Sequence, residues 1–267
     1  LRLDVVEQRT IALLVPLLDG SHHAEFLLGR RWAILESPPS YGILPMIVAT
    51  LYVTALSVIL GTILGLFTSV CLFAFCPKKL VLPLRQLINL LAGIPSVIFG
   101  LFGMTTIVPF LRDYVSPNGV GYGILAASLV LAVMILPTVV SVSLDSLSAV
   151  PKSYYEGALA LGATKEEAVF GIVLPAAKNG ITAGIVLATG RALGETMAVM
   201  LVIGGSPEMP GSLFQSVRTL TANIAMGAME LKDDALSALI ASGVVLFVFA
   251  LLLNISFSAL RCGKKKG

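Results

Sequence analysis

An arginine and a glutamate interrupt a long apolar stretch of the sequence. Arg191 and Glu195 are the two charged residues between positions 180 and 205, within Gly-Arg-Ala-Leu-Gly-Glu-Thr-Met-Ala-Val (190–199). A charge at the centre of an apolar helix costs about 2.5–3.5 kcal/mol on insertion scales, so such residues face a bundle interior or an aqueous pathway. A guanidinium can hold an oxyanion such as phosphate or sulfate by two hydrogen bonds. We therefore expect an anion pathway at Arg191, with Glu195 and Thr196 beside it.

A structural ion pair is the alternative at this place. On an uninterrupted helix, which we expect over 179–203, residues four apart share a face. Arg191 and Glu195 could then pair and lock two helices together, or Glu195 could position the anion or hold Arg191 in the resting state.

A second candidate lies at Gly93-Ile94-Pro95-Ser96. Proline removes a helical hydrogen bond and glycine weakens the same turn, so we expect a helix break there. Broken helices at membrane depth line cavities or are buried in protein. Ser96 could thus offer its hydroxyl to an anion, although an ordinary proline kink fits the same residues.

A polar segment at 153–175 separates two apolar stretches and predicts two short helices with a hinge. Ser153-x-x-Glu156 and Thr164-x-x-Glu167 have the spacing of capping boxes, in which each partner bonds a free N–H of the first turn. Gly162 can adopt the left-handed conformation that ends a helix.

Two prolines delimit this segment. We expect Pro151 to end the preceding helix and Pro175 to close the second short helix. A helix, a glycine turn and a second helix would form a rigid projection between two membrane spans.

The composition requires a membrane protein. Of 267 residues 57% are hydrophobic and only 12% are charged, against about 25% in soluble domains. Several stretches exceed the roughly 18 apolar residues that allow a spanning helix. We predict an all-α polytopic bundle with five clear helices, at 42–75, 80–111 with a break, 121–147, 179–203 and 235–260. Four Gly-x-x-x-Gly pairs suit closely packed helices, and residues 1–20 read as a partial first transmembrane helix.

Basic residues indicate the orientation. Lys and Arg collect in short cytoplasmic loops, and here they cluster near 78–85, 152–178 and 261–266. This places the 153–175 segment and the C-terminus in the cytoplasm, and 20–43, 112–119 and 205–234 outside.

The sequence also excludes several functions. It contains no Gly-x-x-x-x-Gly-Lys-Ser/Thr loop, so nucleotide phosphates have no cradle in this chain. We find no hydrolytic triad, metal cluster or nucleic-acid surface, and we expect no cofactor. The chain is not expected to be an enzyme.

Three segments together resemble a known family. The spacing of Glu156, Ala158 and Gly162, followed by Ile-Val-Leu-Pro (172–175), resembles the EAA loop of ABC-transporter permeases. With Leu-Ala-Gly-Ile-Pro-Ser-Val-Ile-Phe-Gly (91–100) and the 190–199 segment, it is similar to phosphate ABC-importer permeases of the PstC type. The resemblance covers about residues 25–260, and Gly157 departs from it where a second alanine is usual.

The resemblance implies a MetI-like permease domain over 21–267 in a bacterial or archaeal inner membrane. It implies a second homologous permease subunit forming a heterodimer, a cytoplasmic ABC ATPase dimer that grips a coupling loop at 151–178, and an extracytoplasmic phosphate-binding protein. Arg191, Glu195, Thr196 and Ser96 would line the substrate pathway. The coupling residues would be Glu156, Gly157, Ala158, Gly162, Ala163, Thr164, Leu174 and Pro175.

Other functions stay open from the residues alone. A permease for sulfate or molybdate fits the same features. An ion-coupled secondary transporter could use Arg191 and Glu195 as its coupling site, but it leaves the 153–175 pattern unexplained. The intramembrane charges argue against a purely structural scaffold.

Overall fold

Helices form most of the computed structural model, which describes residues 25–34, 37, 39–228 and 233–263. The expected partial helix at 1–20 lies outside these residues. The long helices are α3 (Leu44–Val70), α4 (Lys78–Ala92), α7 (Ile124–Ser148), α10 (Leu174–Leu193) and α13 (Asp233–Gly263), and the shorter α5 (Ser96–Phe102) begins the helical run Ser96–Val115.

The shorter pieces are α6 (Val108–Phe110), α8 (Lys152–Ala160), α9 (Lys165–Ala168), α11 (Met197–Val202), α12 (Leu220–Gly227) and the π-helical turns η1 (Cys71–Phe75), η2 (Gly103–Ile107), η3 (Leu111–Val115) and η4 (Val169–Val173). Two short strands, β1 (Trp32–Ala33) and β2 (Ser40–Tyr41), pair antiparallel ahead of α3.

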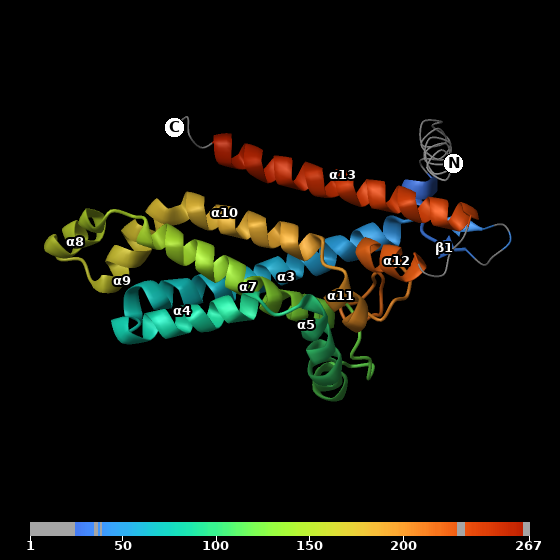
Figure 1. Ribbon diagram of the computed structural model, residues 1–267, viewed down its shortest axis with the longest axis horizontal. Coiled ribbons are helices and arrows are strands. Elements are labelled where there is room, and N and C mark those ends of the chain that lie inside the picture. Colours follow the sequence, from blue (N-terminus) through green and yellow to red (C-terminus); the bar gives the residue numbers. More distant parts are fainter. Residues whose placement is uncertain (1–24, 35–36, 38, 229–232, 264–267) are drawn as a thin grey trace.

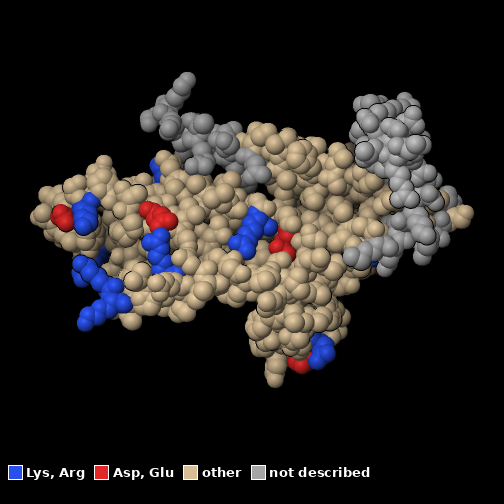
Figure 2. All heavy atoms as spheres, in the orientation of Figure 1, with Lys and Arg blue, Asp and Glu red and all other residues tan. Residues whose placement is uncertain are grey.

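Four continuous helical runs of the described chain are long and apolar enough to cross a membrane. They are Leu44–Phe75, Ser96–Val115, Ile124–Ser148 and Lys165–Leu193, and α13 adds the apolar stretch Ala238–Leu253. Figure 1 shows α3, α7, α10 and α13 running alongside one another, with the run that begins at α5 projecting from them. Charged side chains are few on the face in Figure 2. The all-α, multi-pass prediction is confirmed.

Helix α7 is the centre of the bundle, and small residues bring its neighbours close. A Cβ added to Gly61 of α3 would lie 2.7 Å from Ile135 Cγ1, and one added to Gly65 would lie 2.7 Å from Val139 Cγ1. Without a side chain at these positions the two backbones approach closely, which stabilises helix pairs in lipid. The first Gly-x-x-x-Gly pair therefore acts in packing, as expected.

A second glycine pair attaches α10 to the other end of α7. A Cβ on Gly180 would overlap the Ser146 hydroxyl, and one on Gly184 would lie 3.0 Å from Val142 Cβ. Together the two pairs fix α3 and α10 against the same central helix.

Two helices break inside the bundle. The expected break at 93–95 is present, because α4 ends at Ala92 and α5 begins at Ser96. The expected uninterrupted helix over 179–203 is wrong: α10 ends at Leu193 with Gly194 as its C-cap, and α11 begins at Met197. Glycine favours this end because it loses the most backbone freedom in a helix interior.

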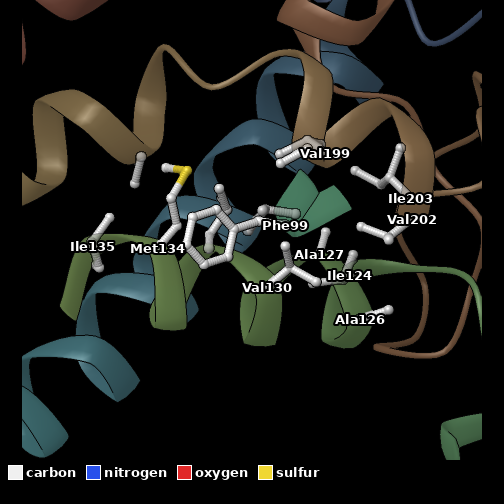
Figure 3. Close-up of a cluster of buried hydrophobic side chains, with 14 of the residues drawn as sticks. Phe99, Ile124, Ala126, Ala127, Val130, Met134, Ile135, Val199, Val202 and Ile203 are labelled. Atoms are coloured by element: carbon white, nitrogen blue, oxygen red, sulfur yellow. The ribbon is translucent and has the colours of Figure 1, made fainter. Parts of the chain in front are cut away.

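An apolar core joins the pieces that follow the two breaks. Phe99 of α5 packs with Val130 and Met134 of α7, and with Val199 and Val202 of α11 (Figure 3). These side chains are at most 7% exposed. The two broken helices are therefore positioned by one shared core.

Candidate functional site

Arg191 lies in the last turn of α10 and is half-buried. Glu195 and Thr196 follow in the non-helical link to α11 and are also half-buried. The Glu195 carboxylate accepts a hydrogen bond from Ala198 N at 3.1 Å, so it satisfies one of the free N–H groups at the start of α11. The structure thus gives Glu195 the role of a helix cap.

The alternative considered above, an ion pair between Arg191 and Glu195, is absent. Arg191 takes part in neither of the two ion pairs found among the described residues, Arg85–Asp145 and Arg112–Asp113. The reason is that α10 ends between the two residues, so they no longer share a helical face. In the part of the chain that the structure describes, the guanidinium is left without an anionic partner.

The helices that follow the two breaks, α5 and α11, are in contact. A Cβ on Gly100 of α5 would come within 2.8 Å of Ala198 Cα, so α5 and α11 pack backbone to backbone at this point. Ser96 precedes Gly100 by one turn on the same face, and Thr196 directly precedes the first turn of α11. Ser96 is half-buried at the start of α5. The contact places the second turn of α5 against the first turn of α11, and Figure 1 shows these two helices as neighbours.

The segment 151–178 begins with α8, a glycine turn and α9, and continues through η4 into the start of α10. The expected capping box at Ser153 is wrong, because α8 already begins at Lys152 and its N-cap residue Pro151 makes no side-chain cap. Pro151 occupies the N-cap position, and its side chain has no oxygen that could accept from an N–H of the first turn. Glu156 is therefore free of a capping role and is exposed on α8.

Gly162 ends α8 as expected. Its φ is +90°, which favours glycine. Gly162 N donates to Leu159 O at 3.0 Å and Ala163 N donates to Ala158 O at 3.1 Å. This pair of bonds is the Schellman motif of a helix C-terminus, and it fixes the corner between α8 and α9.

The capping box at Thr164 is confirmed. Glu167 N donates to Thr164 Oγ1 at 3.2 Å, and Thr164 N donates to Glu167 Oε2 at 2.8 Å. The corner is thus capped on both sides, with Ala163 between the two motifs. It presents exposed side chains away from the bundle while the buried Ala158 faces inward.

Pro175 does not close the second short helix, contrary to expectation. Leu174 and Pro175 lie at the start of α10, and the helical run continues through 29 residues, Lys165–Leu193. The π-helical turn η4 directly precedes them, with Leu174 N donating to Val169 O five residues back. The wider turn accommodates a proline that lacks an N–H and would clash with the preceding turn. One rod of about 43 Å therefore joins the corner at Thr164 to the break at Gly194.

Buried contacts hold the start of this rod to the bundle. Val169 and Val173 of η4 pack with Leu147 at the end of α7 and with Val70 of α3. The exposed corner is consequently the outer part of a segment whose inner face belongs to the core.

Sequence reasoning missed one part of the site. The hydroxyl of Thr221, in the first turn of α12, donates to the backbone carbonyl of Glu195 at 3.0 Å. We expected only an external stretch at 205–234. The signal was present in Thr219, an N-cap residue that precedes an apolar run and accepts from Ala222 N at 3.3 Å.

Comparison with known proteins adds the family to this geometry. The family described as "Binding-protein-dependent transport system inner membrane component" matches residues 61–262. The chain belongs to this family. It is therefore the membrane-embedded transport component of such a system.

Several relatives align with this chain over most of their own length. A protein of Bacillus subtilis called "Probable ABC transporter permease protein YqgH" is 38% identical over 88% of this chain and 77% of its own. The "Phosphate transport system permease protein PstC" of Mesorhizobium japonicum is 35% identical over 90% of this chain and 80% of its own. The PstC 1 protein of Mycobacterium tuberculosis is 35% identical over 81% and 71%.

Solved structures share the fold. The MetNI methionine ABC transporter, solved in inward-facing conformations, aligns with a TM-score of 0.66 at 20% identity, over 83% of this chain and 95% of the other. A bacterial importer of the polysaccharide alginate aligns with a TM-score of 0.62 at 16% identity, over 98% of both chains. The MetI-like architecture predicted from the sequence is confirmed.

Proposed function

We propose that this chain is the permease subunit of an ATP-driven importer of inorganic phosphate. Relatives at 34–35% identity from several bacteria are named phosphate transport permeases. The observation that carries the proposal is Arg191, half-buried at the end of α10 without an anionic partner among the described residues, beside a helix break after which α11 packs on α5.

A dihydrogen or monohydrogen phosphate ion suits this place. Its oxygens can accept two parallel hydrogen bonds from the Arg191 guanidinium. The hydroxyls of Ser96 and Thr196 lie at the starts of the adjacent half-helices α5 and α11 and can donate to the remaining oxygens. Because Glu195 is occupied in capping α11, it positions this wall instead of contacting the anion.

The energy comes from a separate ATPase through the coupling loop. The exposed corner formed by α8, Gly162 and Thr164 offers Glu156 and the first turn of α9 to a cytoplasmic ATPase dimer. Motion of this corner moves the 29-residue rod and hence the break that holds Arg191. Alternating access then exposes Arg191 to one side of the membrane at a time, and a weak site there releases the ion.

The apolar exterior supports the expected neighbours. Every residue of α4 is at least partly exposed, and Leu82, Leu87 and Leu90 are more than 60% exposed. Lipid and a second homologous permease subunit would cover such faces. The phosphate-binding protein would dock on the opposite end from the coupling loop, which with the C-terminus lies in the cytoplasm.

Radiolabelled phosphate uptake tests this proposal. The permease would be reconstituted with its second permease subunit, its ATPase and its binding protein, as wild type and as Arg191→Gln, Arg191→Lys and Arg112→Gln. Losing a charge-assisted contact is worth roughly 1.5–3 kcal/mol, or about 10- to 100-fold in uptake. Arg191→Lys keeps the charge without the two-pronged geometry and should be intermediate, while Arg112→Gln, an exposed arginine paired with its neighbour, should match wild type.

Each other outcome removes a part of the proposal. Undiminished uptake by folded Arg191→Gln would exclude Arg191 from the pathway. Uptake of sulfate or molybdate in place of phosphate would assign another oxyanion, and uptake without ATPase would indicate an ion-coupled transporter.

A further inference from the structure

Helix α12 is wedged between α3 and the break that ends α10. On one side, Leu220 N donates to Thr50 Oγ1 of α3 at 3.1 Å. On the other, Thr221 Oγ1 donates to Glu195 O at 3.0 Å. Thr50, Thr219 and Thr221 are each at most 5% exposed, so these three hydroxyls are shielded from water.

The direction of every bond in this cluster is determined. Thr221 has a single hydroxyl proton, which it donates to Glu195 O. The 3.2 Å bond between the hydroxyls of Thr219 and Thr221 must then be donated by Thr219. Thr219 in turn accepts from Ala222 N. The chain of donors therefore ends on the Glu195 carbonyl, and removing the Thr221 hydroxyl takes their partner from this carbonyl and from the buried Thr219 hydroxyl proton.

The same helix is tied to the segment that precedes it. Arg218 Nε donates to Gly205 O at 2.7 Å, and Arg218 Nη1 donates to Asn223 Oδ1 at 3.2 Å. Val217 N also donates to Ile203 O at 3.2 Å, directly after α11. Residues 203–218 thus connect the end of α11 with the start of α12, while Thr221 connects α12 with the start of α11.

We propose that Thr221 is a positioning residue of the permease. Its hydroxyl fixes the backbone of Glu195, whose carboxylate caps α11, and so sets where α11 stands beside Arg191. This inference rests on the proposed transport function. Without the hydroxyl, α11 and the break move independently of α12 and the loop 203–218, and turnover of the ATPase delivers fewer ions.

The test compares Thr221→Val, which keeps the shape and removes the hydroxyl, with Thr221→Ser, which keeps the hydroxyl. Thr182→Val is the matched control, because the Thr182 hydroxyl bonds only the Lys178 carbonyl of its own exposed helix turn. The measured quantity is phosphate transported per ATP hydrolysed in the reconstituted complex, which does not depend on the amount of folded protein. We expect Thr221→Val to lower this ratio about two- to tenfold, and Thr221→Ser and Thr182→Val to keep it.

A second measurement does not depend on the substrate. A Thr196→Cys substitution, in the permease with Cys71, Cys76 and Cys262 replaced by serine, would be labelled with a small thiol reagent. We expect Thr221→Val to raise the labelling rate about two- to tenfold and Thr182→Val to leave it unchanged. If wild-type protein moves no phosphate, the proposed function fails while this labelling still decides the role of Thr221.

The proposal is overturned by an unchanged ratio and an unchanged labelling rate in Thr221→Val. It is equally overturned if Thr221→Ser behaves like Thr221→Val, since the hydroxyl is then not the active feature. A Thr221→Val complex that is merely less abundant, with a normal ratio, would assign the hydroxyl to folding alone.

Discussion

Replacing Gly162 with alanine tests whether the corner between α8 and α9 is what an ATPase recognises. Gly162 has a φ of +90°, and an added Cβ would meet no atom within 4 Å among the described residues. The effect therefore comes from backbone strain alone, about 1–2 kcal/mol for an L-residue in this conformation. If binding requires the corner as it stands, the affinity for the ATPase should fall about 5- to 30-fold.

The matched control is Gly171→Ala, which is expected to stabilise its helix where Gly162→Ala introduces strain. Gly171, nine residues further on, also has open space where a Cβ would stand, and its backbone is helical. Gly171→Ala should stabilise its helix by up to about 1 kcal/mol and should leave the ATPase affinity unchanged. The assay is a titration of the purified ATPase onto the permease in nanodiscs, with thermal unfolding of the bundle measured in parallel.

Two results would refute this reasoning. Equal ATPase affinities for wild type and Gly162→Ala would mean that the corner is not recognised in this conformation. A lowered unfolding temperature of the whole bundle in Gly162→Ala would mean that the strain is not local to the exposed corner.

Two further substitutions test the break and the second cap. Gly100→Ala places a Cβ 2.8 Å from Ala198 Cα, and because backbone atoms cannot rotate out of the way, α5 and α11 must separate. We expect phosphate uptake to fall at least tenfold with the protein still folded, whereas normal uptake would place the pathway elsewhere. Thr164→Val removes the confirmed capping box and should destabilise the first turn of α9 by about 1 kcal/mol. Amide hydrogen exchange at Glu167 should then be about fivefold faster, and an unchanged rate would show that the cap does not stabilise this turn.

The membrane helices were predictable because lipid leaves the backbone few options. A chain that crosses hydrocarbon must satisfy its own N–H and C=O groups, so charge-free stretches of sufficient length become helices. The stretch expected at 121–147 is the helix Ile124–Ser148, and the break expected at Pro95 lies where α5 begins. Both are local consequences of composition and of proline geometry.

The end of α10 at Leu193 was not predictable in the same way. The spacing of Arg191 and Glu195 fits a continuous helix as well as a broken one. What favours the break is a contact with Thr221, 26 residues away from Glu195, together with a carboxylate that caps the next helix. Local sequence contains the groups for this arrangement but not the fold that brings α12 to them.

The role of Pro175 escapes prediction for a related reason. A proline usually marks a helix end, but here the π-helical turn η4 precedes it and widens the backbone where the ring would clash. The choice between ending and widening depends on the buried contacts of Val169 and Val173 with α3 and α7. These contacts stabilise a continuous helix, and no sequence pattern within 165–178 indicates them.

The continuity of this helix changes how coupling would operate. A second short helix that ended at Pro175, as the sequence predicted, would absorb a displacement of the cytoplasmic corner before it reached the bundle. A single run from Lys165 to Leu193 transmits it, because a helix held by its own hydrogen bonds and by the glycine contacts with α7 moves as one body. The compliant positions are then the glycines just beyond its two ends, Gly162 and Gly194. A displacement that the ATPase imposes at Gly162 should therefore be transmitted to Gly194, beside Arg191. The hydrogen bond from Thr221 of α12 to Glu195 O would resist that displacement.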